Sequence, residues 1–185
     1  MSVSQKRPSS GSPGLSESDG LRAKLLFAIE GIDLSACVAD AEAIAKINPH
    51  RHEMALIDRM VWHNAGYTQG IGLKHVRHDE FWVRGHFPGK PLYPGVLMVE
   101  SAAQVACFLY NSRHPRPQLA VFMRLDDTAF RRAVEPGDDL YILCKEEKYS
   151  LRRFVTAAQG IVGGQIAFET RITGMSIAPG EVGEK

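Results

Sequence analysis

The stretch that decides the fold runs from Arg84 to Cys107 and reads RGHFPGKPLYPGVLMVESAAQVAC. Its first half is dense in glycine and proline, which break regular secondary structure. Pro94 has the fixed φ angle that suits the first turn of a helix, so a helix should begin near Pro94 or Gly95. From there to Leu109 the apolar side chains leave no polar face, which is typical of a buried helix. The sequence therefore predicts one central helix wrapped by the rest of the chain.

Two side chains in this stretch suit acid–base chemistry. Glu100 lies within the apolar helix, and burial favours the protonated form of a carboxyl group, which can donate a proton. His86 is expected at the end of a strand containing Phe81 and Val83, and imidazole is the usual base near neutral pH. The free N–H groups at the start of the helix, at Gly95, could hold a carbonyl oxygen that gains negative charge. A base, an acid and N–H donors in one place indicate a reaction that removes a proton next to a carbonyl group and adds or removes a hydroxyl group.

A resemblance decides between this interpretation and a purely structural role for the histidine and the glutamate. The string GHFPGKPLYPGVLMVESAAQVA resembles the signature GHFPGxPxxPGVLxxExxAQ of the 3-hydroxyacyl-[acyl carrier protein] dehydratases of fatty acid synthesis, the FabZ-type branch of the hot-dog superfamily. Two flanking segments, NPHRHEMALIDR (48–59) and AFRRAVEPGDDL (129–140), resemble LPHRYPFLLVDR and FxRPVxPGDxL of the same family. The resemblance covers about residues 44–176.

The resemblance implies the roles of the site residues. His86 matches the catalytic histidine and Glu100 the catalytic glutamate, whereas the related dehydratase-isomerases carry aspartate at that position. It also implies that the two residues of one site come from opposite subunits, so that a homodimer is obligatory, and that no cofactor or metal is needed. The expected reaction turns a (3R)-3-hydroxyacyl thioester into a trans-2-enoyl thioester and water. Further substrate contacts are expected from Phe87, Pro94, Gly95, Val96 and Gln104.

Composition bounds the class of protein. The chain has 185 residues, 44% of them hydrophobic and 23% charged, which is typical of one globular domain. A net charge of +1 favours neither nucleic acid nor a membrane surface as the main partner, and no apolar run is long enough to span a bilayer. Cys37, Cys107 and Cys144 are widely separated, so we expect no disulfide framework and a cytoplasmic, reducing location.

The chain divides into four expected regions. Residues 1–20 are rich in Ser, Gly and Pro and should form a disordered tail, and 178–185 a C-terminal tail. Residues 21–47 should form a helical arm, with helices at 21–29 and 40–47. Residues 48–177 should form an α+β hot-dog domain, an antiparallel sheet of about six strands around the central helix. The strands are expected at 54–62, 66–76, 119–125, 138–145, 152–161 and 165–175, with Gly163-Gly164 as the last hairpin turn.

Clusters of charged residues have both a structural and a functional interpretation. The basic ones are solvated surface or a docking patch for an acidic acyl carrier protein, as similar positions are in the family. They are Arg131, Arg132, Lys148, Arg152 and Arg153. His50 and His52 beside Glu53 lack zinc-site spacing, so we expect His50 and Arg51 to anchor the chain entry to the first strand instead.

Several alternatives stay open at this level. A hot-dog thioesterase would share the fold, and a non-catalytic acyl-carrier-binding module would need no acid–base pair. The same dehydration on acyl-coenzyme A is compatible with the motif, as is assembly of dimers into a trimer of dimers. Chain length, the role of the arm and a housekeeping or specialised lipid pathway are not set by these patterns.

Overall fold

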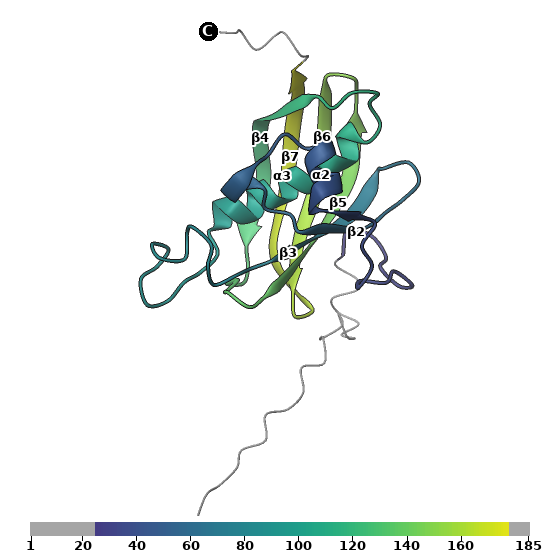
Figure 1. The fold of residues 1–185 in the computed structure, drawn as a ribbon. Coiled ribbons are helices and arrows are strands. Elements are labelled where there is room, and N and C mark those ends of the chain that lie inside the picture. The colour runs from purple at the N-terminus through teal and green to yellow at the C-terminus, as the bar shows by residue number, and fades with distance from the viewer. Residues whose placement is uncertain (1–24, 178–185) are drawn as a thin grey trace, which may run out of the picture.

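Helix α3 (Gly95–Asn111) lies across one face of a curved antiparallel sheet (Figure 1), in a computed structural model that describes residues 25–177. The strands lie in the order β1-β2-β3-β5-β6-β7-β4. Their bounds are β1 Ala39–Asp40, β2 Arg59–His63, β3 Gln69–His75, β4 Leu119–Phe130, β5 Asp139–Tyr149, β6 Arg153–Val162 and β7 Gln165–Ile177. The short helix α2 (Ala41–Ile47) lies beside α3, and His52–Met54 form a single turn of 3-10 helix. The predicted sheet around one long helix is confirmed, with the two-residue strand β1 in addition to the six expected.

The inner face of the sheet is held against α3 by close packing. On β3, a Cβ added to Gly72 would lie 2.4 Å from Cγ2 of Val105, and one added to Gly70 would lie 2.7 Å from Cδ2 of Leu109. The two glycines therefore let the helix approach the strand more closely than any side chain would allow. Because α3 is apolar on all sides, this contact buries most of the helix, as its sequence predicted.

The outer face of the sheet carries a second apolar cluster that the N-terminal arm covers. Leu25, Leu26, Phe27 and Ile29 pack against a cluster of buried strand residues, and the Leu26 N–H donates to Oε1 of Gln159 over 3.0 Å. The buried strand residues are Val61, Ile71, Leu73, Leu143 and Ile161. The helix expected at 21–29 is wrong for its described part, because residues 25–29 run without helical structure; their apolar side chains pack on the sheet instead. Residues 1–24 and 178–185, with the two expected tails, lie outside the described residues.

The segment that leads to the central helix differs from its prediction. The strand expected around Phe81 and Val83 is a series of turns, in which the Val83 N–H donates to the carbonyl of Glu80 over 3.0 Å. The side chain of Glu80 explains the change, since it pairs with the buried Nζ of Lys74 at 2.8 Å and accepts from Nε1 of Trp82 at 3.0 Å. An extended strand would carry Glu80 away from Lys74, so the segment after β3 turns back to keep the two side chains in contact.

The remaining elements follow the sequence closely. Asp40 caps α2 by accepting from the N–H of Ala43 over 2.8 Å, as a helix at 40–47 requires. Gly163 and Gly164 have φ angles of 53° and 74°, so the predicted hairpin turn between β6 and β7 is confirmed. The strand expected at 54–62 is shorter in the structure, where β2 begins at Arg59. Met54 belongs to the 3-10 turn, and residues 55–58 have no regular secondary structure. Neither α2 nor α3, the helices described within 25–177, is long and apolar enough to cross a membrane.

Candidate active site

The backbone holds the imidazole of His86 in one defined state. His86 lies in the loop between β3 and α3, where its N–H donates to the carbonyl of Trp82 over 2.9 Å and its carbonyl accepts from the N–H of Leu92 over 2.8 Å. The ring Nδ1 lies 2.8 Å from the carbonyl oxygen of Leu92. Because a carbonyl oxygen can only accept, Nδ1 carries the proton, and Nε2 of the neutral ring keeps its lone pair. His86 therefore has the tautomer of a base that acts through Nε2.

Helix α3 begins beside this imidazole. The N–H groups of Leu97 and Met98 both donate to the carbonyl of Pro94, at 2.9 and 3.0 Å. The N–H groups of Gly95 and Val96 come before the first intrahelical bond, and no side chain in the described part of the chain caps them. They are the donors that can hold a developing oxyanion.

One open cavity of about 590 Å³ brings the expected residues of this half of the site together. Its lining includes His86, Pro94, Gly95 and Val96, together with the two cations Arg131 and Arg132. Phe87 is half exposed beside it and stacks on the His86 ring at 4.2 Å between centroids. A Cβ on Gly95 would lie 2.8 Å from the ring of Phe130, so only glycine fits beneath that ring without displacing it.

Glu100 lines a different pocket of the same chain. This pocket of about 250 Å³ lies between α3 and the inner face of the sheet, and apart from Glu100 and His50 its lining is uncharged and mostly apolar. The other lining residues are Ala103, Cys107, Ala120, Val121, Phe122, Phe154, Ile172 and Gly174. Burial, together with the nearby charge of Glu100, raises the pKa of the Cys107 thiol to about 12. The pocket is therefore a slot for an apolar group with one carboxyl group on its wall.

Gln104 orients the Glu100 carboxyl group. Its Nε2 donates to Oε1 of Glu100 over 2.9 Å and to the carbonyl of Met54 over 2.7 Å, while its Oε1 accepts from the N–H of Leu56 over 2.9 Å. Only 2% of Gln104 is exposed. We expected Gln104 among the substrate contacts, but the structure places it behind the carboxyl group, tied to the 54–56 segment.

His50 is a site residue that sequence reasoning assigned elsewhere. Its Nε2 lies 3.3 Å from Oε1 of Glu100, and it lines the Glu100 pocket. Anchoring the chain entry, the role expected for His50 and Arg51 together, is done by the Arg51 guanidinium, which donates to the carbonyls of Ala45 and Asn48 over 2.8 and 2.7 Å. The only signal for His50 in the sequence is its place in the 48–59 segment that resembles the family.

The five expected docking cations do not form one patch. Arg131 and Arg132 border the His86 cavity, where Arg131 pairs with Glu169 at 2.5 Å and Nη1 of Arg132 donates to the carbonyl of Val162 over 2.9 Å. Arg152 lies in the turn between β5 and β6, and its carbonyl accepts from the N–H of Ser176 over 3.0 Å.

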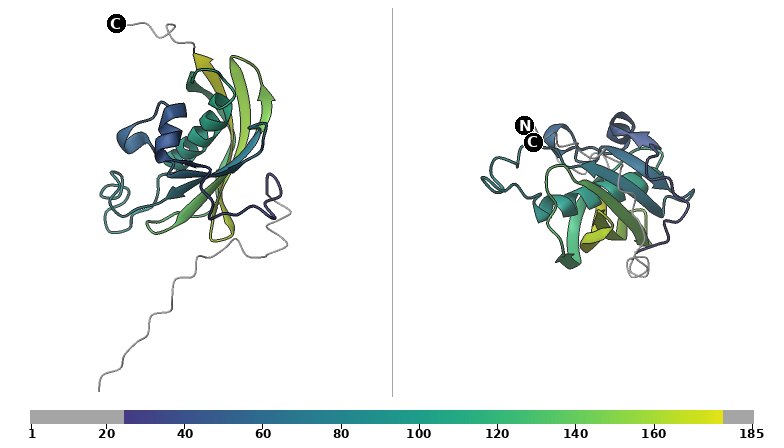
Figure 2. Two further views of the ribbon diagram at one scale, coloured as in Figure 1. Left: turned by 45° about the vertical axis from the view of Figure 1, so that its right-hand side comes forward. Right: turned by 90° about the horizontal axis from the view of Figure 1, so that it is seen from below.

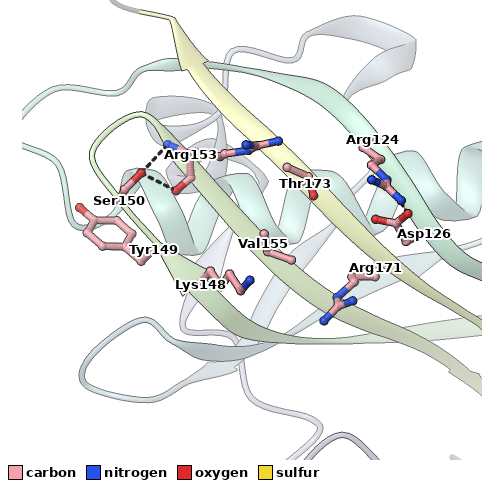
Figure 3. A pocket seen from close by; sticks show the side chains of 9 residues that line it. All are labelled: Arg124, Asp126, Lys148, Tyr149, Ser150, Arg153, Val155, Arg171 and Thr173. Carbon is pink, nitrogen blue, oxygen red and sulfur yellow. Dashed lines mark hydrogen bonds and ion pairs between the residues drawn. The ribbon is translucent and has the colours of Figure 1, made fainter.

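Lys148 and Arg153 line a basic hollow of about 460 Å³ (Figure 3). Strand alternation places it on the outer face of the sheet, since Phe154 points inward to the Glu100 pocket and its neighbour Arg153 points outward. Two other cations in the hollow form ion pairs with carboxylates of neighbouring positions. Arg124 pairs with Asp126 and Arg171 with Glu147, both at 2.6 Å. The remaining lining residues are Tyr149, Ser150, Val155 and Thr173.

Solved structures identify the class of fold. The chain matches the dehydratase heterocomplex ApeI:P from Xenorhabdus doucetiae with a TM-score of 0.66 at 14% identity, covering 75% of this chain and 93% of that one. It also matches Cj0977, a sigma28-regulated virulence protein from Campylobacter jejuni, with a TM-score of 0.58 at 15% identity, covering 80% and 96%. At these identities the likeness shows the fold alone, and the predicted hot-dog fold is confirmed.

Sequence comparison identifies the family within that class. The family model of the FabA-like domain matches residues 48–171. Over 139 residues the chain is 40% identical to the 3-hydroxyacyl-[acyl-carrier-protein] dehydratase FabZ of Alkaliphilus metalliredigens (strain QYMF), covering 74% of this chain and 92% of that protein. The chain therefore belongs to the FabA-like family, as the resemblance of the 85–104 motif predicted.

Proposed function

We propose that this chain is a hydro-lyase that converts (3R)-3-hydroxyacyl thioesters on acyl carrier protein into trans-2-enoyl thioesters and water, in fatty acid or related lipid synthesis. The identity to the dehydratase from Alkaliphilus and the FabA-like domain support this reaction. The structural observation that carries it is the fixed tautomer of His86, which lines the same cavity as Gly95 and Val96, whose N–H groups have no partner among the described residues.

Each proposed step uses one group. The thioester oxygen accepts from the N–H of Gly95, so that negative charge develops there when Nε2 of His86 removes the α-proton. The C3–O bond breaks as Glu100 protonates the departing hydroxyl, which leaves as water, and the electron pair of the C–H bond forms the new double bond. Exchange with solvent then takes the proton from His86 and returns one to Glu100.

The two halves of this site are proposed to meet across a homodimer. Strand β4 ends the sheet in the strand order and, among the described strands, pairs only with β7. It exposes large apolar side chains, which in a monomer would face water along an open edge. They are Leu119, Phe122, Met123, Leu125 and Phe130. A second copy placed against β4 would cover them, and a two-fold axis would bring each His86 to the partner's acid.

Arg131 and Arg132 are the cations that we propose to dock the acyl carrier protein. They border the cavity that holds His86, so an acidic partner bound there would deliver its thioester arm to the base. The apolar slot next to Glu100 would then hold the acyl chain. The three cysteines are free, which fits a cytoplasmic enzyme.

The test is a dehydration assay with 3-hydroxyacyl-acyl carrier protein, followed by the absorbance of the enoyl product. The variants His86→Ala and Glu100→Gln should each lower turnover by about 10²-fold or more, because each removes one proton-transfer group. Parallel reactions with the coenzyme A thioester compare the two carriers, and a thiol reagent measures hydrolysis. Near-normal dehydration in both variants, or release of free thiol in place of enoyl product, would contradict the proposal.

A further inference from the structure

His50 lies against the proposed acid, although the reaction above does not use it. The imidazole Nε2 lies 3.3 Å from Oε1 of Glu100, with 24% of the His50 side chain and 18% of the Glu100 side chain exposed. The contact joins the segment after α2 to the middle of α3. Arg51 fixes that segment, because its guanidinium bonds back to the carbonyls of Ala45 and Asn48.

The two oxygens of Glu100 have different surroundings. Oε1 accepts from Nε2 of Gln104 over 2.9 Å and has Nε2 of His50 as its second neighbour. No donor from the described part of the chain reaches Oε2. An amide N–H and an imidazole N–H can only donate to a carboxyl oxygen. If His50 carries its ring proton on Nε2, both neighbours of Oε1 are donors, and the proton of a protonated Glu100 then belongs on Oε2.

We propose that His50 is a positioning residue that donates from Nε2–H to Oε1 of Glu100, and so makes Oε2 the atom that delivers the proton. The inference rests on the proposed function, in which Glu100 is the acid. A contact of 3.3 Å is long for such a bond, and catalytic hydrogen bonds commonly tighten when the substrate is bound. With His50 and Gln104 both on Oε1, an exchange of the two carboxyl oxygens by rotation would break both contacts.

A role in stability alone does not account for this histidine. Its Nδ1 is buried and has no hydrogen-bond partner in the described structure. An unpaired buried nitrogen lowers stability, so an apolar side chain of similar size should be tolerated or preferred by the fold. A histidine at position 50 is therefore better explained by its contact with the Glu100 carboxyl group than by packing.

The experiment compares His50→Leu and His50→Gln in the full chain, with His78→Leu as a control on an exposed histidine. For each variant, kcat and KM are measured with 3-hydroxyacyl-acyl carrier protein as the substrate. The thermal unfolding midpoint is measured separately on the protein alone. His50→Leu should lower kcat about tenfold or more, with KM within about threefold and an unchanged or higher midpoint. His50→Gln should keep kcat within about threefold, because the amide can replace the Nε2–H donor.

Three results would overturn the inference while leaving the proposed function intact. These are full kcat in His50→Leu, a loss in His50→Gln as large as in His50→Leu, or a change confined to KM or the unfolding midpoint. Wild-type chain without dehydratase activity would instead contradict the proposed function, and the inference would fall with it.

Discussion

His86 and Glu100 line two different pockets of the same chain, the first at the start of α3 and the second between α3 and the sheet. If one site takes its histidine from one subunit and its glutamate from the other, two inactive variants can restore each other. A mixed dimer of His86→Ala and Glu100→Gln has one site with both groups and one with neither. Random pairing of equal amounts makes half of the dimers mixed, so the unseparated mixture should regain about a quarter of wild-type activity and the purified mixed dimer about half.

The measurement is dehydratase activity after the two variants are co-expressed with different affinity tags and the doubly tagged species is purified. Each variant purified alone is the control. Mixed dimers as inactive as either parent would show that one subunit supplies both groups.

Sequence patterns were sufficient where one local signal decided the structure. Pro94 predicted the start of α3 within a residue, and the paired glycines at 163–164 predicted the last hairpin. The resemblance located His86 and Glu100, but neither residue type indicates which pocket it faces.

Long-range partners explain what the patterns missed. The arm at 25–34 packs on apolar residues that are spread over several strands, so its conformation depends on a surface that only the folded sheet creates. The turns at 80–86 depend on the buried ion pair of Lys74 with Glu80, which no periodic pattern in the sequence reveals. The contact of His50 with Glu100 spans fifty positions of the chain, beyond the reach of any local signal.

The buried pair of Lys74 and Glu80 should be essential for stability. Their side chains are only 2% and 7% exposed and lie 2.8 Å apart. Glu80→Gln would leave the Lys74 ammonium buried without its counter-charge, so the free energy of unfolding should fall by about 3–5 kcal/mol. Urea denaturation followed by circular dichroism measures the loss.

The double variant Lys74→Met with Glu80→Gln is the control for this pair. It removes the buried cation as well, so it should recover part of the lost stability. Equal stability of the single and double variants would contradict the proposed cost of an unpaired Lys74.

Gly160 should not tolerate even a methyl group. A Cβ at this position on β6 would lie 2.1 Å from Cε1 of Phe168, which is fully buried on the neighbouring strand. Gly160→Ala should therefore lower the free energy of unfolding by about 1–3 kcal/mol, as overpacking of a core does. Gly66→Ala is the control, because its nearest atom would be Cγ2 of Thr68 at 3.8 Å, an ordinary contact. Similar unfolding midpoints for the two variants in a thermal melt would show that Phe168 moves aside freely.

The three thiols should differ sharply in reactivity. Burial and the charge of Glu100 raise the pKa of Cys107 to about 12, and burial alone raises the pKa of Cys144, whereas Cys37 is exposed. Only the thiolate attacks a disulfide reagent, so at pH 7.5 the two buried thiols should be nearly inert. Ellman's reagent should modify one thiol per native chain and three after denaturation. In Cys37→Ser the native count should drop to zero, and fast reaction of a second thiol in the native wild type would contradict the burial of Cys107 and Cys144.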